Sequence, residues 1–530
     1  MYFVLTASKD TYITDKIINN SFSASDANVG QAATLDLFRL YDESSLSGMI
    51  STNELSRALI KFDFGRIQKL MSSELDLNHG SFNCSLELFD IMGGQVTPSD
   101  FTLICFPLSQ SFDEGLGRDT VSFSDLDASN FYTASYVNGT SVGWFASGAN
   151  EQGKITHPGT YPENIDVIVS GNLNDGGGMA GLGATQYFKN GTENLKLDVT
   201  TIVSATIASI LPDHGFRLSF TGSQEEDNQT RFVKRFASRH VRNRSLQPRL
   251  VVSYDNTILD HHQNFYFDLS GSIFLNNFHR GQAANLLSGS TTLTQLTGSD
   301  CLSLTLRTGS FKETYVVSQH QAGTKQLPNN TNEAAYSYVT GVYSATFAIP
   351  FANTTVVDFN TTLMQMAART GSLTFDEYWH TKDRTVTFYT GSLTIKRNQR
   401  TSFNDAGRNL DLIVTNARPS YDKTERVRFR IFVKEFGVQD KALRVPYQVK
   451  SLVLEEAYYR VIEIDTGAVI IPFKKNNNGT RMSTDSEGMF FDVYMDSIPP
   501  GRNYTFEFDV LDRGTSFIHE AKNVRFRVEA

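Results

Sequence analysis

The sequence has few cysteines, few tryptophans and no long apolar run. The 3 cysteines, Cys84, Cys105 and Cys301, lie far apart and form no CxxC pair. This excludes a disulfide framework and a CxxC-type zinc site, and it favours buried free thiols made in a reducing cytoplasm. No window reaches the roughly 18 apolar residues of a membrane-spanning helix. Met1–Thr6 has no basic residue before its short apolar run. We therefore expect neither a membrane span nor a signal peptide.

An excess of one charge is also lacking, as are heptads and the common catalytic motifs. The formal net charge is −9 over 530 residues, which argues against a nucleic-acid partner. Without heptads the chain is not a coiled-coil fibre shaft. The sequence contains no GxSxG, no HExxH, no P-loop and no GxGxxG after a strand. We therefore predict a protein that is not an enzyme, with no catalytic residue, cofactor or metal ion.

Aromatic residues, glycine and alternating patterns are abundant. The chain has 39 Phe, 21 Tyr and 38 Gly. Apolar and polar residues alternate in Leu250–Tyr254, Val427–Lys434 and Tyr504–Val510, which is typical of strands with one buried face. Only Val199–Ile210 and Thr361–Arg369 have helix-like spacing. The composition and these patterns predict an all-β fold of antiparallel sandwiches.

Two strands followed by polar residues suggest where domains end. The strand-like stretches are Pro248–Tyr254 and Ser392–Lys396. We place boundaries after each, which predicts an N-terminal jelly-roll sandwich over 1–256 and two smaller, Ig-like β-sandwich domains over 257–397 and 398–530. All three lengths are normal for domains.

Two sets of motifs in the first segment carry a family resemblance. The first set is Asp10–Ile13, Asn28–Gly30 and Ser56–Asp63. The second set is Leu197–Thr200, His214–Leu218, Phe236–Arg239 and Pro248–Val252. In order and spacing they resemble the DNRLRE-type jelly-roll domains of surface-polymer-binding and virion proteins, over roughly residues 1–255. In a jelly roll the first and last strands often lie side by side, so we expect Tyr12–Ile13 to lie next to Leu250–Val252.

Other stretches look most like structural proteins of tailed bacteriophages. Phe232–His240 and Asn264–Asn277 contribute to this likeness, and Tyr458–Ile462 and Ser486–Phe491 resemble Ig-like virion modules. The resemblance implies a neck, tail, baseplate or fibre-anchoring component of a virion. It also implies assembly in the bacterial cytoplasm, binding to other virion proteins and a symmetric homo-oligomeric ring. The alternative is an adhesin whose jelly roll binds host polysaccharide. A depolymerase is disfavoured because no β-helical repeat is visible.

Three stretches are candidates for binding a partner. Arg231–Arg249 contains seven basic residues and no acid, and Glu225–Asp227 precede it. It either binds an anionic partner (polysaccharide, nucleic acid or an acidic subunit) or forms a strand surface paired with nearby acids, and we favour the second interpretation. Trp144-Phe145 and Trp379-His380 are either sugar-stacking platforms or core aromatics, and we favour the core.

Four further stretches are candidates for ligand or metal sites. His261 and His262 beside Asp260 are adjacent, so they point to opposite faces of an extended chain and are better explained as linker residues. Asn172–Gly176 lacks the glutamate of a calcium loop and is better explained as a turn. Gly176–Gly183 has no following Lys-Ser/Thr for phosphate binding and predicts a long loop. Asp10 and Asn28 resemble the family's end-loop cluster, where Ca²⁺ is possible, but loop hydrogen bonding is favoured.

Overall fold

The computed structural model describes most of the chain. Outside the described residues lie 19–21, 42–52, 72–73, 78, 92–98, 122–126, 161–162, 174–177, 290–291, 322–337, 359, 398–408, 436–450, 513, 522–523 and 530, together with the side chains of 232 and 233. The described residues are mostly strands, which confirms the all-β class. Their α-helices are short: α1 (Gly65–Met71), α2 (Thr200–Ile207), α3 (Gly222–Glu226) and α4 (Leu363–Thr370). None of these helices has the length and apolar character needed to cross a membrane.

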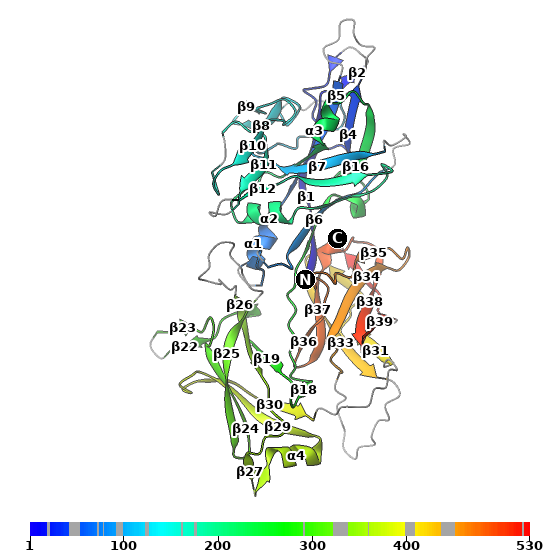
Figure 1. The fold of residues 1–530 in the computed structure, drawn as a ribbon. Coiled ribbons are helices and arrows are strands. Elements are labelled where there is room, and N and C mark those ends of the chain that lie inside the picture. Colours follow the sequence, from blue (N-terminus) through cyan, green and yellow to red (C-terminus); the bar gives the residue numbers. More distant parts are fainter. Residues whose placement is uncertain are drawn as a thin grey trace.

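Three β-rich domains follow one another along the chain (Figure 1). We call residues 1–254 domain 1, residues 265–396 domain 2 and residues 410–529 domain 3. In the view of Figure 1, domain 1 lies above the other two, and the amino terminus lies where the three domains meet. The predicted boundaries, after residues 256 and 397, fall between these groups of strands. The residues 398–408 that follow the second boundary lie outside the described part.

Domain 1 is a sandwich built from one branched ten-stranded sheet and three smaller sheets of two or three strands. Its strands are β1 (Tyr2–Thr14), β2 (Ile17–Ile18), β3 (Phe22–Ser23), β4 (Thr34–Tyr41), β5 (Asn53–Phe62), β6 (Asn83–Leu88), β7 (Phe101–Pro107), β8 (Thr133–Val137), β9 (Thr140–Gly143), β10 (Gln152–Ile155), β11 (Val167–Asn172), β12 (Met179–Gly181), β13 (Ala184–Phe188), β14 (Leu195–Asp198), β15 (Phe216–Phe220), β16 (Arg231–Ala237) and β17 (Arg249–Ser253). The order is β13-β7-β15-β5-β1-β17-β6-β14, with β4 and β16 attached to β5. Both ends of this path contribute to one core, for example through Leu103 and Leu86.

Strand β1 joins the two halves of domain 1. Its first part, Tyr2–Thr6, pairs with β17, and its second part, Ala7–Thr14, pairs with β5 after a register shift at Ala7/Lys9. Strand β1 therefore lies beside the last strand, as expected, but the predicted partnership of Tyr12-Ile13 with Leu250–Val252 is wrong. Tyr12 and Ile13 face Ala58 and Arg57 of β5, because the β-bulge passes β1 from one partner to the other.

Domain 2 consists of one seven-stranded sheet around its own core and three two-stranded sheets. Its strands are β18 (Phe265–Tyr266), β19 (Gly271–Asn276), β20 (Phe278–His279), β21 (Gln282–Ala283), β22 (Leu287–Ser288), β23 (Thr294–Gln295), β24 (Leu302–Thr308), β25 (Phe311–Gln321), β26 (Tyr338–Phe347), β27 (Val356–Asp358), β28 (Thr361–Thr362), β29 (Ser372–His380) and β30 (Thr387–Lys396). The main sheet runs β18-β30-β29-β24-β25-β26-β19. Leu363 and Ala367 of α4 join the core.

Domain 3 is a sandwich of two sheets. Its strands are β31 (Leu410–Val414), β32 (Ser420–Asp422), β33 (Arg426–Glu435), β34 (Glu456–Glu463), β35 (Val469–Ile471), β36 (Ser483–Asp485), β37 (Gly488–Tyr494), β38 (Asn503–Asp512), β39 (Thr515–Glu520) and β40 (Phe526–Glu529). One sheet is β31-β33-β37-β36 and the other is β32-β40-β38-β34-β35, with β39 on β38. Phe429 and Phe491 of the first sheet pack edge-on against Phe506 of the second.

Domains 1 and 3 share a core along β1 and β17. Odd and even positions of these strands point to opposite faces. Phe3, Leu5 and Val252 lie in the core of domain 1, whereas Tyr2 and Val251 lie in the core of domain 3. A backbone hydrogen bond from Val4 N to Ser497 Oγ (3.0 Å) adds to the contact. The two domains are therefore packed as one unit. We call their shared contact along β1 and β17 the 1–3 seam.

The segment that connects domains 1 and 2 is bound to domain 3. Leu259 forms a parallel bridge with Thr484 of β36. Thr484 N donates to Ile258 O (2.8 Å), and Thr484 Oγ1 donates to Asp260 O (2.9 Å). The polar stretch that follows the first predicted boundary is thus an ordered connection along domain 3.

Candidate functional site

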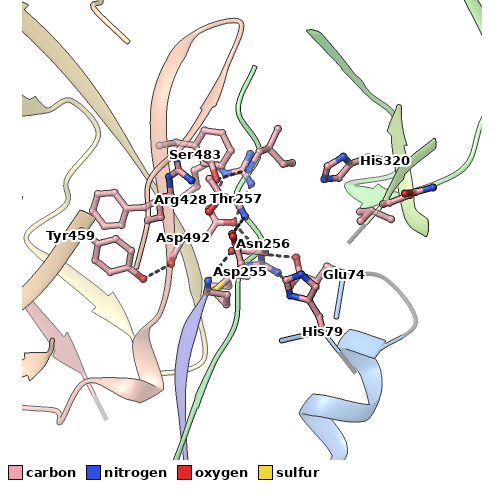
Figure 2. A pocket seen from close by; sticks show the side chains of 18 residues that line it. Glu74, His79, Asp255, Asn256, Thr257, His320, Arg428, Tyr459, Ser483 and Asp492 are labelled. Carbon is pink, nitrogen blue, oxygen red and sulfur yellow. Dashed lines mark hydrogen bonds and ion pairs between the residues drawn. The ribbon is translucent and has the colours of Figure 1, made fainter. Parts of the chain in front are cut away.

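A polar cavity lies where the three domains meet (Figure 2). Its volume is about 250 Å³. Domain 1 contributes Glu74 and His79, the connection contributes Asp255, domain 2 contributes His320 and domain 3 contributes Arg428. Because every domain supplies part of the wall, the cavity exists only when the domains are docked.

An ion network crosses this junction. Arg426 of β33 reaches Glu74 of domain 1 (3.1 Å) and Asp492 of β37 (3.0 Å), and Arg428 also binds Asp492 (2.8 Å). Burial alone would lower the pKa of Arg426, but the carboxylates of Glu74 and Asp492 outweigh it and raise the pKa above its usual range. Burial likewise would raise the pKa of Asp492, and the two arginines hold it below its usual range. Arg426 and Asp492 are therefore charged at neutral pH, and the Arg426–Glu74 contact braces domain 1 against domain 3.

Burial weakens the charged form of two further groups of the cavity, the Met1 amine and His320. The Met1 amine donates to Tyr254 O (2.6 Å) and Asn256 Oδ1 (2.8 Å). Burial lowers its pKa to about 5, although the Asp255 carboxylate acts in the opposite direction. Burial also lowers the pKa of His320. Since Arg426 and Arg428 are already paired with Glu74 and Asp492, this part of the cavity has the character of a structural joint.

The basic segment Arg231–Arg249 is largely paired within domain 1. Arg231 forms two bonds to Asp227 (2.7 and 2.6 Å), as the favoured interpretation expects. The other partners lie far away in sequence: Lys234 with Asp90, Arg235 with Asp36, Arg239 with Glu114, and Arg249 with Glu87. Strand pairing β16–β4 brings Asp36 to Arg235, and β17–β6 brings Glu87 to Arg249. This surface is therefore neutralised by its own domain.

Two basic residues of that segment remain for a different site. Arg242 and Arg244 line a cleft across the 1–3 seam together with Arg502 and Arg527 of domain 3. The cleft has a volume of about 540 Å³. Arg502 binds Glu463 (2.6 Å), whereas the other three arginine side chains have no acidic partner among the described residues. We call this feature the arginine cleft. It has the charge and hydrogen-bond donors to bind carboxylates.

The two tryptophans lie in cores. Trp144 is 7% exposed and its Nε1 donates to Asn130 O (2.9 Å). Trp379 is buried in domain 2, and the neighbouring His380 is buried and hydrogen-bonded to Thr305 Oγ1 (2.8 Å). The favoured interpretation of core aromatics is confirmed for both. Only Phe145 is exposed, so no tryptophan-lined sugar platform exists at either position.

The other candidate sites do not converge on a ligand. His261 faces Ser272, whereas Nε2 of His262 lies 3.4 Å from Glu377 Oε2, so the two histidines point to different partners. Asn172 ends β11, and Asn174–Gly176 lie outside the described residues. The loop predicted over Gly176–Gly183 is only partly a loop, because Met179–Gly181 pairs with β11 as β12. Its residues 176 and 177 lie outside the described part.

Asp10 and Asn28 do meet in one cluster. The Asn28 side chain donates to Glu114 O (2.8 Å) and Ser129 O (2.9 Å), and it accepts the N–H of Gly117 (2.9 Å). Asp10 N donates to Glu114 Oε1 (2.9 Å). Burial raises the pKa of Asp10 to about 7, although a hydrogen bond from Arg239 N acts in the opposite direction. The sequence did not indicate Glu114, because it lies in a loop about a hundred residues away from Asp10.

No known protein family and no curated protein matches this chain. Among solved structures, the D00-D0 domain of intimin is 10% identical and aligns with 50% of this chain and 94% of its own, at a TM-score of 0.14. Trypsin-activated alpha-2-macroglobulin from Escherichia coli is 10% identical over 100% of this chain and 30% of its own, at a TM-score of 0.15. Scores this low carry no argument. The structure itself defines the class: an all-β protein of three β-rich domains.

Proposed function

We propose that this chain is a structural assembly protein of the kind found in tailed-phage virions, which acts through contacts between subunits. The observation that carries the proposal is the 1–3 seam. Tyr2, Val4 and Val251 lie in the core of domain 3 while their neighbours along β1 and β17 lie in the core of domain 1. Such a shared core holds the two sandwiches rigidly together. A component that transmits force within a particle needs this rigidity.

The arginine cleft provides a place for a neighbouring subunit. Arg242, Arg244 and Arg527 converge on it from both sides of the seam. Arginines at an interface bind carboxylates in a bidentate manner and steer association. The chain has 57 Asp and Glu residues against 48 Lys and Arg, and carboxylates of a second copy would complement the cleft. This supports the closed, symmetric oligomer that the resemblance implies.

The carbohydrate-binding alternative has less support. The sugar platform considered at Trp144-Phe145 lacks its tryptophan, because Trp144 is only 7% exposed. The third possibility, a depolymerase, gains no support from the junction cavity, where the charged groups pair with one another.

The oligomeric state of the full chain tests the proposal. We expect sedimentation velocity to detect a discrete oligomer whose formation weakens as salt is added, because screening reduces charge pairing. The double substitution Arg242→Glu/Arg244→Glu should shift the chain to monomer. Arg369→Glu, an exposed position on α4 of domain 2, is the matched control and should leave assembly unchanged. A monomer at every concentration, or turnover of a host glycan by the purified chain, would contradict the proposal.

A further inference from the structure

One side of domain 1 brings three potential metal ligands together. Asp10 lies on β1, two residues before Tyr12, so both side chains project from the same face of the strand toward the main core. Glu114 lies in the loop after β7, and His240 lies in the turn after β16. One ligating atom from each of these residues lies within 4.8 Å of the others.

Two of these atoms lack partners. Asp10 is fully buried, and its Oδ1 has no hydrogen-bond partner among the described residues. The Nε2 of His240 has no hydrogen-bond partner there either and lies 3.4 Å from Glu114 Oε1. Buried polar atoms are nearly always satisfied in folded proteins, and an orphaned one requires a water, an ion or another explanation. Here a carboxylate oxygen and an imidazole nitrogen, two efficient ligands of a cation, are orphaned together.

We propose that Asp10, Glu114 and His240 bind one divalent transition-metal ion of the zinc class. Such ions accept mixed carboxylate and imidazole ligands, and three protein ligands leave one position for water. Calcium is a poor fit, because it takes six to eight oxygen ligands. With metal–ligand bonds of about 2.1 Å, the ligands of a tetrahedral ion lie roughly 3.4 Å apart. A small movement of His240, whose side chain is 27% exposed, closes the site and leaves an entry path.

The surrounding residues hold two of the ligands in place. Asn28 clamps the backbone of Glu114, as described above. The loops approach so closely that a Cβ at Gly30 would lie 1.8 Å from Glu114 O, so glycine is required there. Arg239 N donates to Asp10 Oδ2 (2.5 Å). Supporting contacts of this kind orient ligands in metal sites.

Arg239 also limits the affinity. Its guanidinium binds Glu114 Oε1 (2.6 Å) and Oε2 (3.1 Å). The site therefore holds two carboxyl groups and one guanidinium beside the imidazole. A cation must share Glu114 with Arg239, which predicts a dissociation constant in the micromolar range rather than the nanomolar range.

Calorimetric titration of the full chain with ZnCl₂ after EDTA treatment tests the site, with CaCl₂ in parallel. We expect saturable uptake of one Zn²⁺ per chain and no comparable uptake of Ca²⁺. Asp10→Asn keeps an acceptor for Arg239 N–H but removes the charge, and His240→Ala removes the nitrogen ligand. Each should weaken zinc binding at least about tenfold. His157→Ala, an exposed histidine of the same domain, should bind like the unmodified chain.

A spectroscopic reading keeps the test decisive if Asp10→Asn fails to fold. Co²⁺ bound to an imidazole-containing site of low coordination number gives intense visible absorption, which His240→Ala should abolish. The proposal is overturned if zinc uptake is absent, if it persists unchanged in His240→Ala, or if Ca²⁺ is preferred. The result is independent of oligomeric state, so it does not decide the proposed assembly role.

Discussion

Trp144 fixes a small secondary core of domain 1. Its ring packs with Ile13, Leu108 and Phe112, and its Nε1 is satisfied by Asn130 O. Trp144→Ala removes a large buried side chain and leaves a carbonyl without its donor. We expect it to lower the free energy of unfolding by about 3–5 kcal/mol, measured by urea denaturation of the full chain.

The adjacent Phe145 is a matched control. It is 51% exposed, so Phe145→Ala should change the free energy of unfolding by no more than about 0.5 kcal/mol. If Trp144→Ala instead left stability intact and abolished binding to a host polysaccharide, the sugar-platform interpretation would be restored.

Asp260 makes stability depend on pH. Burial raises its pKa to about 7, although the His262 N–H bond to Oδ1 acts in the opposite direction. Below about pH 4 the carboxyl is protonated in both states, and between about pH 4 and pH 7 only the folded state keeps the proton. The stability that this group contributes is therefore complete at low pH and lost as the pH rises through about 7.

Asp260→Asn keeps the acceptor for His262 N–H and removes the titration. At about pH 8 the variant should be more stable than the unmodified chain by up to about 4 kcal/mol, and at about pH 4 the two should be equal. Melting temperatures of both proteins across this range are the measurement. Parallel pH curves for the two proteins would show that Asp260 is ionised without cost in the folded state.

Sequence reasoning reached the local residue contacts and missed the distant ones. The pair Asp227–Arg231 was expected because the acid lies four residues before the arginine. Pairs such as Asp36–Arg235 depend on strand register, which a single sequence does not reveal. The Asp10 cluster needed both kinds of information: the motif positions of Asp10 and Asn28 were visible, whereas Glu114 and His240 join them only through folding.

Individual strands were predicted well. Val427–Lys434 and Tyr504–Val510 lie within β33 and β38, and both helix-like stretches contain helices, α2 and α4. The Asn138-Gly139 pair makes the hairpin turn between β8 and β9, with φ values of 52° and 77°. The short α1 and α3 were missed, since 7 and 5 residues are too few to set a helical period.

The two-sided strands β1 and β17 could have been interpreted further. Met1–Leu5 and Leu250–Val252 are continuously apolar, a pattern typical of strands buried on both faces. A single sandwich of this kind offers only one buried face, so the second face pointed to another domain. Which domain it was depends on contacts such as Arg66 with Asp496, between residues more than 400 positions apart.

Because of the seam, two neighbouring valines of β17 are buried in different domains. Val251 faces the core of domain 3 and Val252 the core of domain 1. A carboxylate without a partner is costly in either core, about 3 kcal/mol or more. Val251→Asp should therefore release domain 3 from domain 1, and calorimetry should record separate melting transitions where the unmodified chain has a shared one.

Val252→Asp is the control for this experiment. It should lower the melting temperature of domain 1 without first separating a folded domain 3. If both variants gave the same melting profile, the seam would not be the contact that couples the two domains.

At the scale of the whole molecule, the order of domains along the chain differs from their packing. Domain 2 lies between domains 1 and 3 in sequence, yet domains 1 and 3 share the apolar seam and the ion network of Arg426. Domain 2 has a core of its own, and the connection to it is held along β36. The stiff unit is thus made by the first and last parts of the sequence, and domain 2 is attached to it.

This arrangement has a consequence for biosynthesis. The outward face of β1 and β17, with Tyr2, Val4 and Val251, leaves the ribosome long before the strands that cover it. At roughly 5–20 residues per second, the ribosome needs many seconds to complete the later domains. During that interval the nascent chain exposes this apolar face, so we expect chaperones to bind it. A chain that terminates prematurely within domain 2 should be prone to aggregation.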